Sequence, residues 1–295
     1  MYKSMYNTLA ELLKQSCDHG VPLWRIVLEN ESRLTGCEEQ EIFGKLAAHY
    51  DVMCHSSEQA LHKGLSMAGG LIAGIASRQH DYAGQGGISG SLINLIMARA
   101  LSCSEVNASM GKICAAPTAG ACGVLPAVLI SVGEKYALVR RAILEALLTA
   151  SGIGAVIMKN ATVAGAEGGC QAECGAAAAM AAAAAVQMAG GSAVMSIHAC
   201  SFALMNVMGL ICDPVAGLVQ VPCAQRNASQ AVNAIISADL ALSGTPSLIP
   251  ADEVIDAMYR VGRKLPSELK ETALGGIAAA PTAKAIVENR LCSCI

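Results

Sequence analysis

The middle of the chain contains a long run without charge, and this run constrains the fold more than any other feature. Residues 175–212 include no Asp, Glu, Lys or Arg, and alanine is their most frequent residue. Small side chains let helix backbones approach one another closely, so the run predicts densely packed helices. It is a poor match to a membrane span, because alanine is a weak anchor and polar residues are scattered through it. We therefore expect buried helices rather than a bilayer helix.

The composition of the whole chain supports an all-α fold with few or no strands. Of the 295 residues, 54% are hydrophobic but only 3% are aromatic and 15% are charged. No run of alternating β-branched residues predicts a strand. The low charged fraction predicts that a partner chain covers part of the surface. A net charge of −3 without a large basic cluster argues against nucleic acid and an anionic membrane as partners.

The sequence divides near residue 65. Residues 1–65 carry charge at an ordinary density, with apolar residues at helical spacing, which predicts a helical cap or a subunit-contact region. Further along, Asp252 is expected to cap a helix that begins there. The amphipathic N-terminus does not resemble a secretory signal, and 13 cysteines make an odd count for a disulfide framework. We expect a cytoplasmic protein with reduced thiols.

Two glycine- or proline-marked turns are candidates for substrate contacts. The turn that contains Gly69 and Gly70 lacks the spacing of a phosphate loop, and it is either a close-packed turn or a substrate-facing loop. The segment A-A-P-T-A-G-A-C-G, residues 115–123, predicts a turn that opens a helix. Free N–H groups and the Thr118 hydroxyl at such a start can bind a substrate carboxylate, or they form a plain N-cap.

Cysteines at both ends of the uncharged run indicate a metal site. Cys170 lies in a glycine-led turn, Cys212 precedes Asp-Pro, and Cys223 follows Pro222. Thiolates bind soft metals and iron–sulfur clusters, and the separations are much longer than the two to four residues of paired zinc-finger ligands. Cys174 lies one helical turn after Cys170, and composition alone does not decide which of the two binds metal.

Lys159 and Asn160 precede the central stretch and are catalytic candidates because they are close to it in sequence. Lys159 could in principle form a Schiff base with pyridoxal phosphate. A lone lysine without a phosphate-binding glycine/serine loop is weak support for that chemistry. Closeness in sequence does not fix geometry, so the base that removes a substrate proton stays open.

Three segments carry a resemblance to a known family. They read A-P-T-A-G-A-C-G-V-L-P-A, E-G-G-C-Q-A-E-C-G, and C-D-P-V-A-G-L-V-Q-V-P-C followed by x-x-R-N. Together, and in this order, they resemble the α chain of iron–sulfur-dependent bacterial L-serine dehydratase. The likeness runs from about residue 105 to residue 281. It implies that residues 66–295 form the catalytic domain and that Cys170, Cys212 and Cys223 hold a [4Fe–4S] cluster.

The resemblance further implies an activity and a partner. It implies deamination of L-serine to pyruvate and ammonia without pyridoxal phosphate, by an α chain that joins a β chain in a hetero-oligomer. It also implies that a C-terminal cysteine, Cys292 or Cys294, could cap the open iron at rest, although a frayed C-x-C end is as good an interpretation. Two alternatives are an L-cysteine desulfidase with related chemistry and a non-catalytic subunit stabilised by metal.

Overall fold

The structure, a computed structural model, describes residues 4–291 of the chain and the side chains of residues 4–289. The described part is all-α, as predicted, and its only strand-like pairing is one isolated bridge between Cys212 and Lys270. The α-helices are α1 (Leu9–His19), α2 (Leu23–Thr35), α3 (Glu39–Glu58), α4 (Ile75–Gly84), α5 (Gly90–Ala108), α6 (Val124–Lys135), α7 (Arg140–Asn160), α8 (Gly165–Gly168), α9 (Ala176–Met188), α10 (Ala193–Met205), α11 (Cys223–Leu242), α12 (Ala251–Lys264) and α13 (Pro281–Ile286).

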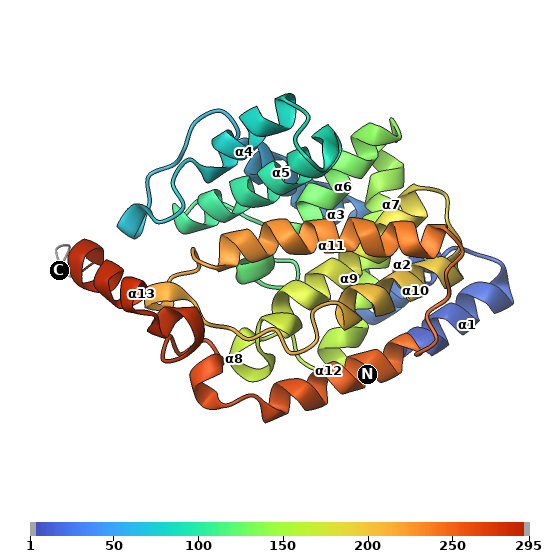
Figure 1. Ribbon diagram of the computed structural model, residues 1–295. Helices are drawn as coiled ribbons and strands as arrows, with labels where there is room; N and C mark the ends of the chain where they lie inside the picture. The colour runs from blue at the N-terminus through green and yellow to red at the C-terminus, as the bar shows by residue number, and fades with distance from the viewer. Residues whose placement is uncertain (1–3, 292–295) are drawn as a thin grey trace.

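Helix α9, the alanine tract, lies in the interior of the fold. Every residue of this helix is buried except Gln187, which is half-buried. Helices α6, α7, α10 and α11 pack around it (Figure 1). Close approach depends on small residues, since a Cβ atom added at Gly154 of α7 would lie 2.8 Å from the Met180 sulfur. The predicted dense packing of Ala- and Gly-rich helices is therefore confirmed.

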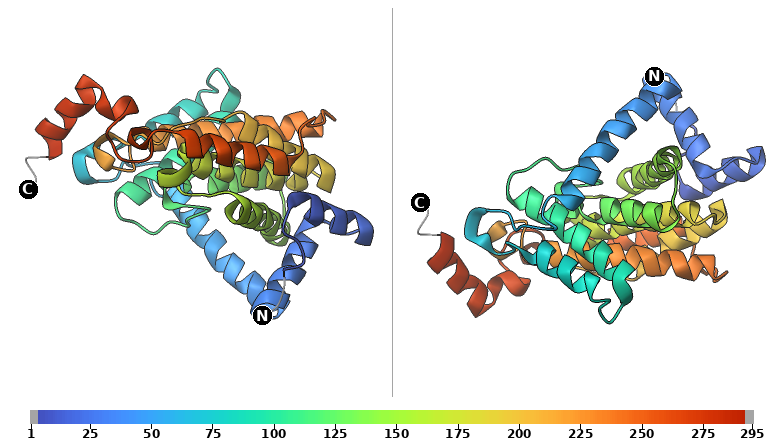
Figure 2. Two further views of the ribbon diagram at one scale, coloured as in Figure 1. Left: turned by 90° about the horizontal axis from the view of Figure 1, so that it is seen from below. Right: turned by 90° about the horizontal axis from the view of Figure 1, so that it is seen from above.

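The N-terminal helices lie against the rest of the domain rather than apart from it. Helix α2 packs on α7, and α3 packs on α5 and α6, while the two helices diverge from their connection like the sides of a V (Figure 2). One buried apolar cluster includes residues from both sides of residue 65. The division into a region of residues 1–65 and a domain of residues 66–295 stays a prediction.

Asp252 caps a helix other than the one that was expected. Helix α12 begins at Ala251 after Pro250, and no side chain caps its start. The two carboxylate oxygens of Asp252 instead accept hydrogen bonds from the backbone N–H groups of Leu9 and Ala10, at 2.8 and 2.9 Å. The prediction for Asp252 was wrong because the free N–H groups of α1 lie beside it and compete for the same acceptor.

Within the described residues, α7 is the one helix that is long and apolar enough to cross a bilayer. Of its most apolar window, 67% is buried inside the fold. Core helices meet the same test of length and composition, and α7 packs against α2 and α9 in this way.

Candidate active site

Cys170 lies in an irregular turn that enters α9. Gly169 before it has a φ of 78°, in the left-handed region, and residues 171–175 form a π-helical turn. The Gln171 side chain fixes this turn: its amide nitrogen donates to the carbonyls of Gly168 and Met258, and its oxygen accepts from Gly209 N–H at 2.8 Å. Single π-helical turns occur often at functional sites, and this one holds the Cys170 thiol in the interior.

Cys212 lies on an extended segment that pairs with the last part of the domain. Its N–H donates to the carbonyl of Leu269 at 2.9 Å, and its carbonyl accepts from Glu271 N–H at 2.7 Å. The next residue, Asp213, accepts a hydrogen bond from Ile277 N–H at 2.7 Å. These hydrogen bonds fix the segment that carries the buried Cys212 thiol.

Cys223 is the first residue of α11, directly after Pro222. Asn227, one turn later, donates to the carbonyls of Cys223 and Gly120, and its side-chain oxygen accepts from Gly123 N–H. This amide thus joins the start of α11 to the turn that follows Thr118. A bridge of the same kind joins the Gly69–Gly70 turn to the loop between Cys212 and Cys223, since Gln220 binds the backbone of Ala68 and Leu71.

Arg226 supplies positive charge to this group of thiols. Its guanidinium lies 2.8 Å from Asp213 Oδ1 and donates to the Ile211 carbonyl. A hydrogen bond from the Cys174 thiol lowers the pKa of Cys170, and the Arg226 guanidinium adds to this shift. Burial raises the pKa of the Cys223 thiol to about 12 and that of Cys212 further. Of the three thiols, Cys170 is therefore the readiest to become a thiolate.

The three predicted ligands fit a soft metal group. Cys170 and Cys212 are buried and Cys223 is half-buried, and the charges of Cys170 and Cys223 each act on Cys212. In the described part of the chain, no three His, Cys, Asp or Glu side chains converge as the ligands of a single ion do. A cluster is wider than one ion, so its thiolate ligands lie farther apart. The donor set suits iron and sulfide better than it suits a hard cation.

The Thr118 hydroxyl points at a carboxylate of the chain itself. It donates to Glu173 Oε1 at 2.9 Å and does not cap the short 3-10 turn of Ala119–Ala121, so α6 begins only at Val124. Sequence reasoning missed Glu173, which follows Cys170 by three residues and so lies near it within the same turn. Burial raises the pKa of Glu173, and the nearby Glu271 adds to the shift. The role of Thr118 in carboxylate binding stays a prediction.

Lys159 and Asn160 lie at the exposed end of α7. The Lys159 ammonium donates to the side chain of Asn7, and the Asn160 amide donates to the Asn7 carbonyl at 2.7 Å. The structure thus brings these two candidates to the N-terminal segment, whereas Thr118 lies beside Glu173. Cys292 and Cys294, the candidates for a capping thiol, lie outside the described residues.

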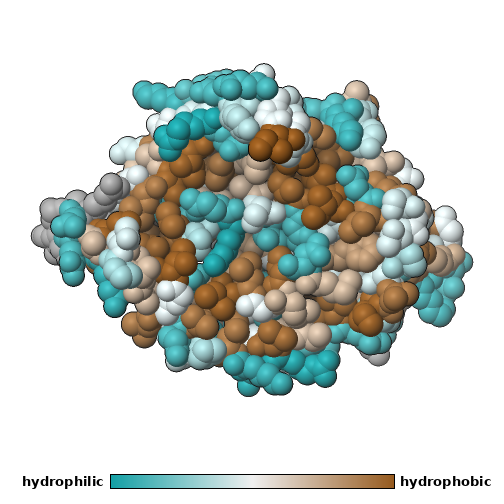
Figure 3. Space-filling view, viewed as in Figure 1, coloured by the Kyte–Doolittle hydropathy of each residue, from teal (hydrophilic) through white to brown (hydrophobic). Residues whose placement is uncertain are grey.

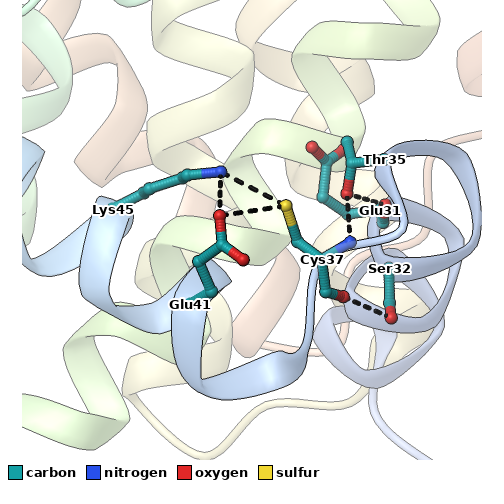
Figure 4. A network of polar contacts seen from close by, with 6 residues as sticks. All are labelled: Glu31, Ser32, Thr35, Cys37, Glu41 and Lys45. Carbon is teal, nitrogen blue, oxygen red and sulfur yellow. Dashed lines mark hydrogen bonds and ion pairs between the residues drawn. The ribbon is translucent and has the colours of Figure 1, made fainter.

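Two hollows and one polar cluster lie elsewhere on the molecule. An apolar hollow of about 490 Å³ lies between α3 and α7, and its lining includes none of the three predicted ligands. Another of about 450 Å³ includes Ala119 and Gln220 in its lining, next to the turn of Thr118. Between α2 and α3, Cys37 donates to Glu41 and accepts from Lys45, both on α3, with contacts of 3.2 and 3.3 Å (Figure 4). This last group is an exposed ion pair with a thiol beside it.

Comparisons with known proteins agree with the motifs. The family described as "Serine dehydratase alpha chain" matches residues 18–278. The chain is 50% identical to the L-serine dehydratase α chain of Peptoniphilus asaccharolyticus, over 96% of this chain and 97% of that protein. It is 43% identical to a probable L-serine dehydratase α chain of Bacillus subtilis, over 95% and 93%. An L-serine dehydratase of Escherichia coli is 35% identical over 92% of this chain, which spans 61% of that longer protein.

Proposed function

Because this chain belongs to the serine dehydratase α chain family, we propose that it is the α subunit of an L-serine dehydratase. The reaction would remove water from L-serine, and the resulting enamine would hydrolyse to pyruvate and ammonia. The observation that carries the proposal is that Cys170, Cys212 and Cys223 come from three separate segments and lie close enough for their charges to act on one another, with Arg226 beside Cys170.

The cysteines would hold a [4Fe–4S] cluster, which would supply a Lewis acid when it is bound. The chain's own residues supply the surroundings. Arg226 would favour the Cys170 thiolate, and its ion pair with Asp213 fixes the segment that follows Cys212. Burial of the thiols would exclude water from the metal-binding side of the site.

Pyridoxal phosphate has no part in the proposal. A Schiff base with this cofactor needs a lysine inside a phosphate-binding site. Lys159, the lysine nearest to the central stretch in sequence, is exposed and donates to Asn7. This arrangement does not place Lys159 in a site for an aldehyde cofactor.

A β chain is the proposed partner. Two relatives are named as α chains, and this chain spans only 61% of the longer E. coli enzyme. The surface supports a partner too: apolar side chains cover much of the face that α11 crosses (Figure 3), and Ile236 and Leu240 of α11 are 48% and 45% exposed. Exposed apolar patches of this kind mark protein interfaces.

The test is anaerobic purification of this chain together with its β chain, followed by iron and sulfide analysis and a pyruvate assay with L-serine. We expect roughly four irons per α chain and pyruvate formation. Sulfide release from L-cysteine without pyruvate formation from serine would identify a desulfidase instead. Bound zinc, with no turnover of either amino acid, would identify a non-catalytic subunit.

A further inference from the structure

The carboxylate of Glu173 packs against two glycines beside one of the proposed ligands. A Cβ atom built on Gly165 would lie 2.6 Å from Glu173 Oε2 and 3.1 Å from the Cys212 sulfur. A Cβ atom built on Gly120 would lie 3.1 Å from Glu173 Oε1. The Glu173 carboxylate and the Cys212 thiol therefore both pack closely against Gly165, and the carboxylate also packs against Gly120.

The Glu173 carboxylate accepts a hydrogen bond but has no cationic partner among the described side chains. Thr118 donates to Oε1, and among the side chains of residues 4–289 no Lys, Arg or His forms an ion pair with this carboxylate. Asp213, the other acidic side chain of the site, is paired with Arg226. Glu271 adds a second negative charge near Glu173. A mostly buried carboxylate without a counter-ion is unfavourable, so this position favours a cationic ligand.

We propose that Glu173 binds the α-ammonium group of the amino-acid substrate and so selects amino acids over hydroxy acids. The inference rests on the proposed function. Thr118 donates to Oε1, and no donor among the described residues bonds to Oε2, so this second oxygen can accept a hydrogen bond from an ammonium group. An amino acid bound to Glu173 through its ammonium group presents its carboxylate and side chain to the cysteines. A hydroxy acid of the same shape has no charge for Glu173 to bind.

Two pairs of competitive inhibitors, each matched in shape, test the inference on the αβ holoenzyme. L-alanine and glycine carry the ammonium group, whereas L-lactate and glycolate carry a hydroxyl in its place. A hydrogen bond between charged groups is worth enough to give about a 10-fold to 100-fold preference for the ammonium member. We expect that preference in the wild-type enzyme. Equal inhibition constants within each pair would overturn the inference before any variant is made.

Glu173→Gln then assigns the preference to this residue. We expect KM for L-serine to rise about 10-fold or more and the preference for ammonium inhibitors to fall to near unity, with iron content unchanged. Glu253→Gln, at an exposed position in the first turn of α12, is the control and should leave the preference intact. An unchanged preference in Glu173→Gln would overturn the inference.

Failure of the proposed function would look different. A wild-type holoenzyme that forms no pyruvate from L-serine would reject the serine dehydratase activity itself. An active wild type whose inhibitor preference survives Glu173→Gln would reject only the role of Glu173. If Glu173→Gln does not retain iron, Glu173→Asp provides the measurement, because it keeps the charge: we expect it to retain the ammonium preference, and loss of that preference would overturn the inference.

Discussion

The guanidinium of Arg226 lies 2.8 Å from the carboxylate of Asp213, and this ion pair connects the first turn of α11 to the residue after Cys212. Asp213 is 1% exposed, so its charge depends on Arg226 for compensation. Arg226 also donates to the carbonyl of Ile211. One side chain therefore fixes both residues that flank Cys212 while it lies beside the Cys170 thiol.

Arg226→Met should destabilise the chain strongly. Removing one partner of a buried ion pair leaves an uncompensated charge, here that of Asp213, and costs about 3 kcal/mol or more. The free energy of unfolding in urea measures the effect. Arg260→Met breaks the exposed ion pair with Asp256 on α12 and is the matched control, with little expected change. Equal losses in the two variants would contradict the structural role of the Arg226–Asp213 pair.

Each proposed ligand should be needed for metal. We expect Cys170→Ala, Cys212→Ala and Cys223→Ala each to abolish both bound iron and pyruvate formation. Cys200→Ala, at a fully buried position in α10, removes a thiol of the core and should keep its iron. Full iron and activity in any one of the three ligand variants would show that the ligand set is wrong.

Cys174 distinguishes an open metal site from a closed one. Its thiol is hydrogen-bonded to Cys170 and is fully buried. We expect Cys174→Ala to retain iron, because Cys170, Cys212 and Cys223 suffice as ligands. Loss of iron in this variant would favour a closed cage of four thiolates, and a parallel assay with L-serine would show whether activity is lost with it.

Thr118→Ala should weaken substrate binding without loss of the metal. The change removes the donor that holds Glu173 Oε1, a hydrogen bond worth on the order of 1 kcal/mol. We expect KM for L-serine to rise by about fivefold and the iron content to stay as in the wild type. An unchanged KM would remove Thr118 from the binding site.

Gly165→Ala should disturb the site, because the new methyl group meets Glu173 Oε2 and the Cys212 sulfur. Overpacking of this kind costs about 1–3 kcal/mol, and we expect iron content to fall with stability. Gly44→Ala is the control: it lies on the exposed side of α3 with nothing within 4 Å of the added carbon, and it should raise stability by about 0.5–1 kcal/mol. A stable, iron-replete Gly165→Ala variant would contradict the geometry.

Stability should decrease at alkaline pH. Burial raises the pKa of Cys103 to about 12, from 9.0, and that of Tyr6 to about 12, from 10.0. The unfolded chain loses these protons first, so the stabilisation is complete below about pH 9 and is lost as the pH rises towards 12. Each group contributes a slope of about 1.4 kcal/mol per pH unit in that window. Urea unfolding of the metal-free chain with reductant, at pH 8 to 11, measures it, and Cys103→Ala should flatten the slope.

The all-α fold class could be predicted from the sequence because helix formation depends on residue patterns within one segment. The alanine tract predicted a buried helix, and α9 is that helix. Helix ends that depend on contacts with residues distant in sequence were harder to predict. Helix α11 begins at Cys223, and the bonds of Asn227 to the turn of Gly120–Gly123 support its first turn. Gly152 and Gly154 lie within α7, where Val27 and Met180 pack against them.

The site was predictable in part. A glycine-led turn and neighbouring prolines singled out the cysteines, and the roles of all three as ligands stay a prediction. Glu173 is three residues from Cys170 but gave no signal of its own, because its partner Thr118 is 55 residues away in sequence. The π-helical turn and the pairing of Cys212 with residues 269–271 depend on contacts with α12 and the segment after it, which no local pattern encodes.

The pairing of Cys212 with the C-terminal part of the domain sets an order of events during synthesis. Ribosomes release the N-terminal part of a chain first, and Cys170 emerges long before residues 269–277. The segment of Cys212 and Asp213 takes its observed form only when Leu269, Glu271 and Ile277 are there to bind it. The thiols of a nascent chain therefore stay unsequestered until residues 269–277 have been translated.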